Sequence, residues 1–79
     1  QDFGEKRRAE AVYRAALELN PNHAEAHNNL GVVLAQRGNL AAASEQFAEA
    51  LRIDPDHADA TANLARARAA QSRRPKAKP

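Results

Sequence analysis

The chain has 79 residues, of which 43% are hydrophobic, and twenty of these hydrophobic residues are alanine. It contains no Cys, which excludes disulfides and Cys-based metal sites, and its longest apolar run, four residues, is too short for a membrane span or a signal peptide. The net charge of +2 divides into −4 over residues 1–59 and +6 over residues 60–79. Because alanine strongly favours helix and β-branched residues are few, the composition predicts an all-α domain. The compartment is unknown from the sequence, and without a signal peptide or a membrane span the cytoplasm is only the default.

Two helices are predicted in the first half of the chain. The first covers residues 5–19 and ends at Asn20-Pro21, because the residue before a proline is pushed out of helical geometry. The second covers residues 24–37, where apolar side chains recur at the spacing of one helix face. Gly38 then favours a left-handed stop.

Two more helices are predicted in the second half. One covers residues 40–53 and ends at Asp54-Pro55, and the other covers residues 58–71. Beyond it, residues 72–79 have no apolar face and contain two prolines, so we expect a basic, disordered tail. Residues 1–71 therefore form the predicted domain.

The sequence repeats itself at an offset of 34 residues. Both aromatic side chains of the helices, both Pro-containing turns and an Asn-Leu pair fall into one register. Such a period is typical of solenoid proteins. The matches are Tyr13 on Phe47, Asn20-Pro21-Asn22-His23 on Asp54-Pro55-Asp56-His57, and Asn29-Leu30 on Asn63-Leu64.

Small and large residues stand at fixed offsets within residues 24–57, namely Leu30-Gly31, Leu34, Gly38, Ala43, Phe47, Ala50 and Pro55. This order resembles the tetratricopeptide repeat. Residues 1–23 resemble the second half of such a repeat, and residues 58–71 resemble the first half. The resemblance implies an α-solenoid fragment of four antiparallel helices.

Three positions depart from the pattern of the family. His27 replaces a frequent aromatic residue, Ala65 stands where the first unit has Gly31, and Arg68 stands where it has Leu34. Arg68 makes the outer face of the last helix polar, as a terminal helix requires.

The resemblance implies a protein-interaction scaffold that binds an extended peptide or a partner helix on its concave face. Helices 24–37 and 58–71 would line this face. The expected contact residues are Glu25, Asn28, Asn29, Val32, Gln36, Asp59, Asn63 and Arg66.

Asn29 and Asn63 recur at the repeat period. They resemble the asparagine ladder in the superhelix of the O-linked N-acetylglucosamine transferase family, whose amides would bond a peptide backbone. The alternative is that Asn29 bonds only neighbouring backbone or water. A carboxylate clamp of the chaperone-binding type requires Lys and Arg, whereas Asp59 and Asn63 stand on the corresponding helix, so we do not expect one.

The sequence predicts no catalytic site, no cofactor and no metal. It has no Gly-rich phosphate loop and no nucleophile motif. His23 and His27 have a spacing of four that could bind a metal, but the repeat places His23, and its counterpart His57, just before a helix. We therefore expect His23 and His57 to serve as helix-start residues.

The Arg/Lys tail could contact nucleic acid or another acidic surface, but a solvated tail is the more common role of such a segment.

The first helix is the second half of a repeat, so we expect part of its apolar face to be uncovered and to promote homodimerisation at the N-terminal side. The residues of this face are Phe3, Ala9, Val12, Tyr13 and Leu17.

Overall fold

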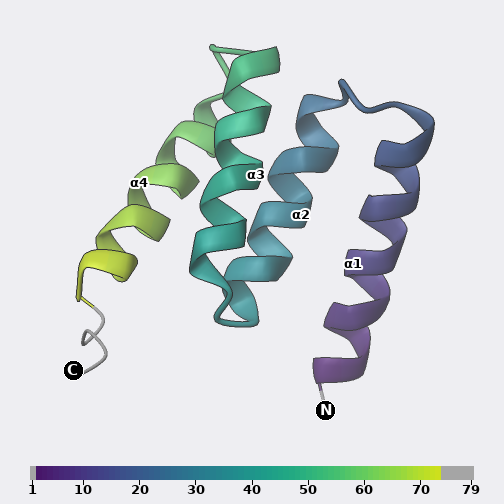
Figure 1. Ribbon diagram of the computed structural model, residues 1–79, viewed down its shortest axis with the longest axis horizontal. Coiled ribbons are helices and arrows are strands. Elements are labelled where there is room, and N and C mark those ends of the chain that lie inside the picture. The colour runs from purple at the N-terminus through teal and green to yellow at the C-terminus, as the bar shows by residue number, and fades with distance from the viewer. Residues whose placement is uncertain (1, 74–79) are drawn as a thin grey trace.

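The computed structural model describes residues 2–73 of the chain and the side chains of residues 4–73. It contains α1 (Asp2–Leu19), α2 (Ala24–Gln36), α3 (Leu40–Ile53) and α4 (Ala58–Arg73), and no strand among these residues. Consecutive helices run antiparallel and pack side by side in chain order (Figure 1). The predicted all-α fragment of four antiparallel helices is confirmed.

The predicted helix bounds need three corrections. Helix α1 begins at Asp2 instead of residue 5, and α2 ends at Gln36, with Arg37 as its C-cap. Helix α4 continues to Arg73, two residues beyond its predicted end at residue 71, so it includes the first two residues of the predicted tail. The remainder of the predicted tail, residues 74–79, lies outside the described residues.

The predicted turns are present at the helix ends. Gly38 has a positive φ of 84°, and the amides of Gly38 and Asn39 donate to the carbonyls of Ala35 and Leu34 at 2.9 and 2.8 Å. Glycine suits this left-handed position because it has no Cβ. After α1 and α3, the side chains of Asn20 and Asp54 accept hydrogen bonds from the amides two residues later.

Histidine begins two of the helices. The Nδ1 atoms of His23 and His57 accept hydrogen bonds from the amides of Ala26 and Ala60, both at 3.1 Å. The side chains thereby satisfy one of the free N–H groups in each first turn. The predicted helix-start role of both histidines is confirmed.

The core lies between α2 and α3. Its fully buried members are Leu30, Leu34, Ala43, Phe47 and, from α4, Ala67. Small residues bring the helices close together, as the sequence predicts.

Helix α1 packs against α2 alone among the described elements, and its side chains are less buried than their counterparts in α3. Ala43 and Phe47 are fully buried, whereas Ala9 and Tyr13 at the same repeat positions are half-buried.

The expected uncovered face of α1 is smaller than the sequence suggests. Tyr13 and Leu17 pack against the core, and only Val12 of the expected residues with described side chains is well exposed, at 60%. The side chain of Phe3 lies outside the described residues.

Candidate partner-binding groove

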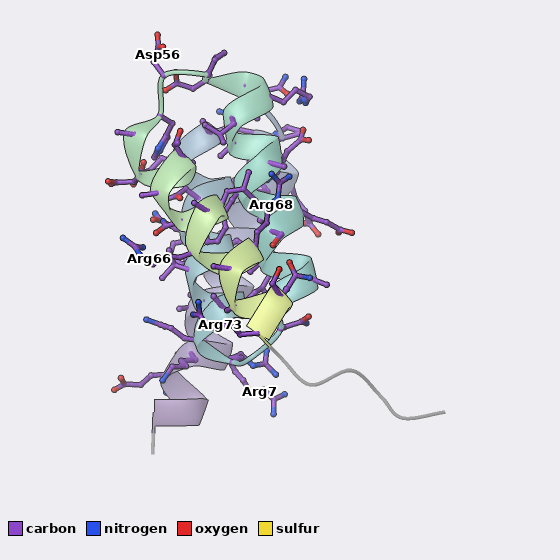
Figure 2. All side chains as sticks on the ribbon, turned by 90° about the vertical axis from the view of Figure 1, so that its left-hand side faces the viewer. Arg7, Asp56, Arg66, Arg68 and Arg73 are labelled. Carbon is purple, nitrogen blue, oxygen red and sulfur yellow. The ribbon has the colours of Figure 1, made fainter. Side chains whose placement is uncertain are left out.

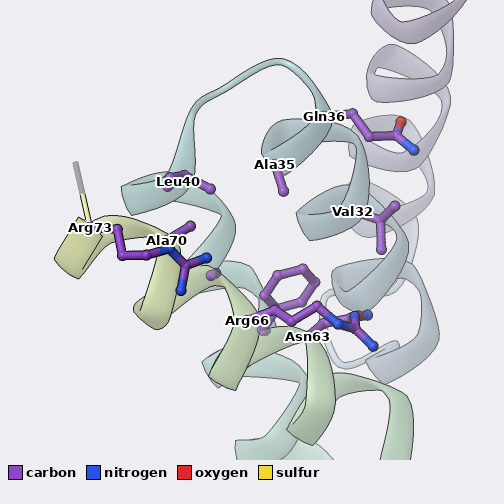
Figure 3. A pocket seen from close by; sticks show the side chains of 10 residues that line it. Val32, Ala35, Gln36, Leu40, Asn63, Arg66, Ala70 and Arg73 are labelled. Carbon is purple, nitrogen blue, oxygen red and sulfur yellow. The ribbon is translucent and has the colours of Figure 1, made fainter.

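A groove of about 370 Å³ opens between α2 and α4 (Figure 3). Helix α3 contributes to its floor through Leu40 and Phe47. The ring of Phe47 reaches this position because it is wedged between α2 and α4 within the core. The residues that line the groove are Val32, Ala35, Gln36, Leu40, Phe47, Asn63, Arg66, Ala67, Ala70 and Arg73.

The groove combines an apolar floor with a polar edge. Six of its lining side chains are apolar, and the only charged ones are Arg66 and Arg73. Both arginines are exposed on α4, and no Asp or Glu is among the lining residues. An apolar surface with a few oriented polar groups is the usual composition of a binding site.

A chain of side-chain hydrogen bonds holds one end of the groove. Arg66 donates from Nη1 to Oδ1 of Asn63 at 2.7 Å, and Asn63 donates from Nδ2 to Oδ1 of Asn28 at 3.1 Å. Asn28 is only 4% exposed. These bonds connect α4 to α2 and fix the orientation of the Asn63 amide.

Half of the predicted contact residues line the groove, namely Val32, Gln36, Asn63 and Arg66. Asn28 does not offer a free contact, because it is buried and bonded to Asn63. Asn29 is half-buried and lies outside the groove lining. Asn63 is therefore hydrogen-bonded to the side-chain amide of Asn28, and not to that of Asn29, which is the repeat counterpart of Asn63.

The two predicted acidic contacts also lie outside the groove lining. Glu25, in the first turn of α2, accepts a hydrogen bond from Nε2 of His57 at 2.8 Å. Asp59 is exposed in the first turn of α4. Glu25 thus connects the starts of α2 and α4.

Sequence reasoning missed Ala67, Ala70 and Arg73 on α4. They follow Asn63 and Arg66 at helical spacing, so they share one face of α4 with them. This spacing could have identified the two alanines. Arg73 was missed because the helix was expected to end at residue 71.

The described residues contain no group of three or more His, Cys, Asp or Glu side chains arranged to hold a metal ion. The Nδ1 atom of His23 accepts the hydrogen bond of the Ala26 amide at the start of α2, so it is not directed at a metal site shared with His27. The ring of His27 lies 2.8 Å from both Oε1 of Gln46 and the carbonyl oxygen of Pro21.

A separate ionic cluster connects α1 to the end of α2, away from the groove. Glu10 accepts hydrogen bonds from Arg14 and Arg37. Burial of the Glu10 carboxyl raises its pKa, but the two guanidinium groups outweigh this effect and hold the pKa below the ordinary value of 4.5.

Comparison with known proteins gives one family. Residues 1–58 match the family described as "Tetratricopeptide repeat", which covers well over half of the chain. No curated protein is significantly similar to the chain. No helix in residues 2–73 has the length and apolar character needed to cross a membrane.

Proposed function

The chain belongs to the tetratricopeptide repeat family, and from this premise we propose that the groove between α2 and α4 binds a segment of a partner protein. Tetratricopeptide repeats mediate protein–protein interactions, and members of the family are typically scaffolds without enzymatic activity. The finer assignment, an extended peptide or a helix bound in this particular groove, is our proposal.

One observation carries the proposal: an apolar floor is open to solvent between two helices and is bordered by groups that can donate hydrogen bonds. Burying one Leu-sized side chain there would contribute about 1.5–3 kcal/mol. Gln36, Asn63 and Arg66 stand at the edge, where they can fix the orientation of the bound segment.

A pair of matched variants tests this groove. Peptides would be selected on the 79-residue chain from a phage-displayed random library. Their affinity would then be measured for the parent chain and for Ala70→Glu, which places a carboxylate in the groove. Ala69→Glu makes the same change on an exposed neighbour that does not line the groove. We expect Ala70→Glu to abolish binding and Ala69→Glu to retain it. Equal binding to both variants would contradict the proposal.

The basic segment of residues 60–79 supports a second candidate, contact with nucleic acid or another acidic surface. Three of its six bases lie on α4. Figure 2 shows Arg66 and Arg68 on opposite sides of this helix, so they do not form one stripe. Binding to phosphates would weaken steeply as salt is raised, whereas peptide binding in the apolar groove would change little.

A further inference from the structure

The two arginines of the groove occupy backbone positions about two helical turns apart on α4. Arg66 and Arg73 are seven residues apart on α4, which is about two helical turns or about 10.5 Å along the axis. Figure 3 shows both side chains at the edge of the groove, with Ala70 beside the Arg73 side chain. The groove therefore combines an apolar floor with two positive charges on α4.

Neither arginine is neutralised by the described part of the protein. Arg14, Arg37 and Arg52 each pair with a glutamate. Arg66, in contrast, donates only to the neutral amide of Asn63, and no ion pair within residues 4–73 includes Arg73. A guanidinium has five donors, so most of the hydrogen-bonding capacity of both groups is available to a partner.

We propose that the partner segment is an amphipathic helix that carries two acidic residues seven positions apart, with bulky apolar residues at the third and fourth positions between them. This inference rests on the proposed function of the groove. The two carboxylates would pair with Arg66 and Arg73, and the apolar side chains would enter the floor between α2 and α4. Complementary charge of this kind selects a partner more than it adds affinity.

A helix fits this spacing better than an extended strand. Residues i and i+7 of a helix share one face and are about 10.5 Å apart. In a strand, residues on one face are separated by about 6.6 or 13 Å, and neither interval equals the spacing of the Arg66 and Arg73 backbone positions along α4. The apolar positions i+3 and i+4 of the helix then face the partly exposed side chains of Val32, Ala35 and Leu40.

The floor also favours a protein over a nucleic acid. A phosphate backbone requires several cations along one track, and the groove offers two around an apolar surface. The partly exposed apolar side chains of Val32, Ala35 and Leu40 would gain nothing from facing a phosphate.

The inference is tested by selecting helices without bias and then altering their charge. A phage-displayed library of 18-residue amphipathic helices, randomised on one face, would be selected on the 79-residue chain. We expect selected sequences to carry Asp or Glu seven residues apart with Leu, Ile or Phe between them. Synthetic versions with Gln at both acidic positions should bind about tenfold more weakly in fluorescence anisotropy.

Variants of the chain provide the reciprocal measurement. Arg66→Gln and Arg73→Gln should each weaken binding of the acidic peptide about threefold, and should not affect the Gln peptide. Arg68→Gln removes the same charge from the same helix outside the groove, and should change neither affinity.

The outcomes separate this inference from the function on which it rests. Selected helices without paired acids, whose binding is still abolished by Ala70→Glu, would overturn the acidic partner and leave the groove function in place. If no selected peptide depends on Ala70, both fail. A 20-nucleotide single strand that binds more tightly than the peptides, and that loses affinity in Arg66→Gln and Arg73→Gln, would also overturn the inference.

Discussion

The aromatic ring of Phe47 lies directly against the α-carbon of Gly31. A Cβ placed on Gly31 would be 2.5 Å from Cε1 and 2.7 Å from Cδ1 of this ring, closer than carbon atoms can approach. Phe47 is only 2% exposed and has no free space into which it could move. This contact sets how closely α2 approaches α3, and it holds Phe47 where its ring reaches the groove.

Gly31→Ala should therefore destabilise the fold. Overpacking typically costs about 1–3 kcal/mol, which exceeds the gain of up to about 1 kcal/mol from replacing a helical Gly by Ala. Gly4→Ala is the matched control, since no atom lies within 4 Å of the added Cβ. Urea unfolding of both variants would show a lower midpoint for Gly31→Ala alone. A stabilised Gly31→Ala would mean that α2 and α3 are not so closely packed.

His57 is expected to stabilise α4 through its cap. His57→Ala removes the acceptor of the Ala60 amide and should cost about 1 kcal/mol of unfolding free energy. His57→Ser keeps a capping oxygen but loses the hydrogen bond to Glu25, so it should recover most of this cost. If Ser is as destabilising as Ala in thermal unfolding, the bond to Glu25 is the more important one.

Glu10 should make stability depend on pH in the acidic range. The folded-state pKa of its carboxyl is lowered from 4.5, so its contribution is complete above that value and is lost as the pH falls through the folded-state pKa. Because the cluster is partly solvated, we expect an effect of no more than about 1 kcal/mol.

Glu10→Gln should accordingly be less stable than the parent chain at pH 7 and should approach it in stability as the pH falls below the folded-state pKa of Glu10. Urea titrations at several pH values measure this convergence. Glu45→Gln, which removes an exposed carboxyl outside any ion pair among the described residues, is the control. A constant difference between Glu10→Gln and the parent at all pH values would exclude the ionic cluster as its cause.

The exposed apolar side chains of α1 are Val12 and Leu19, so we expect self-association to involve the side of α1 on which they lie. Val12 and Leu19 are 60% and 89% exposed and lie seven residues apart, on one side of this helix. We expect the mass in light scattering to rise above 8.6 kDa with concentration. Val12→Glu should reverse the rise, and Ala41→Glu on the exposed side of α3 should not. A constant 8.6 kDa at all concentrations would refute the prediction.

The repeat allowed the four helices and their turns to be predicted, because proline, glycine and histidine act locally at Asn20-Pro21, Gly38 and His57. These residues determine where a helix starts or stops without reference to the remainder of the fold. The sequence pattern ended the last helix too early, at residue 71 instead of Arg73, and for this reason Arg73 was missing from the predicted contact residues. The final turn of this helix contains Arg73, and with it half of the positive charge of the groove.

The groove itself was only partly predictable. Its polar edge, Asn63 and Arg66, followed from the repeat position of the helix. The bond between Asn63 and Asn28 did not, because it depends on the distance between α2 and α4, which side-chain packing sets. The same holds for Phe47, whose ring belongs to the core and yet forms part of the floor.

The most direct test of the groove is a map of backbone chemical shifts in a ¹⁵N-labelled chain titrated with a selected helical peptide. Binding in the groove predicts that the largest changes occur on the facing sides of α2 and α4, at Val32, Ala35, Asn63, Ala67 and Ala70. Changes concentrated on α1, or on the exposed side of α3, would contradict it.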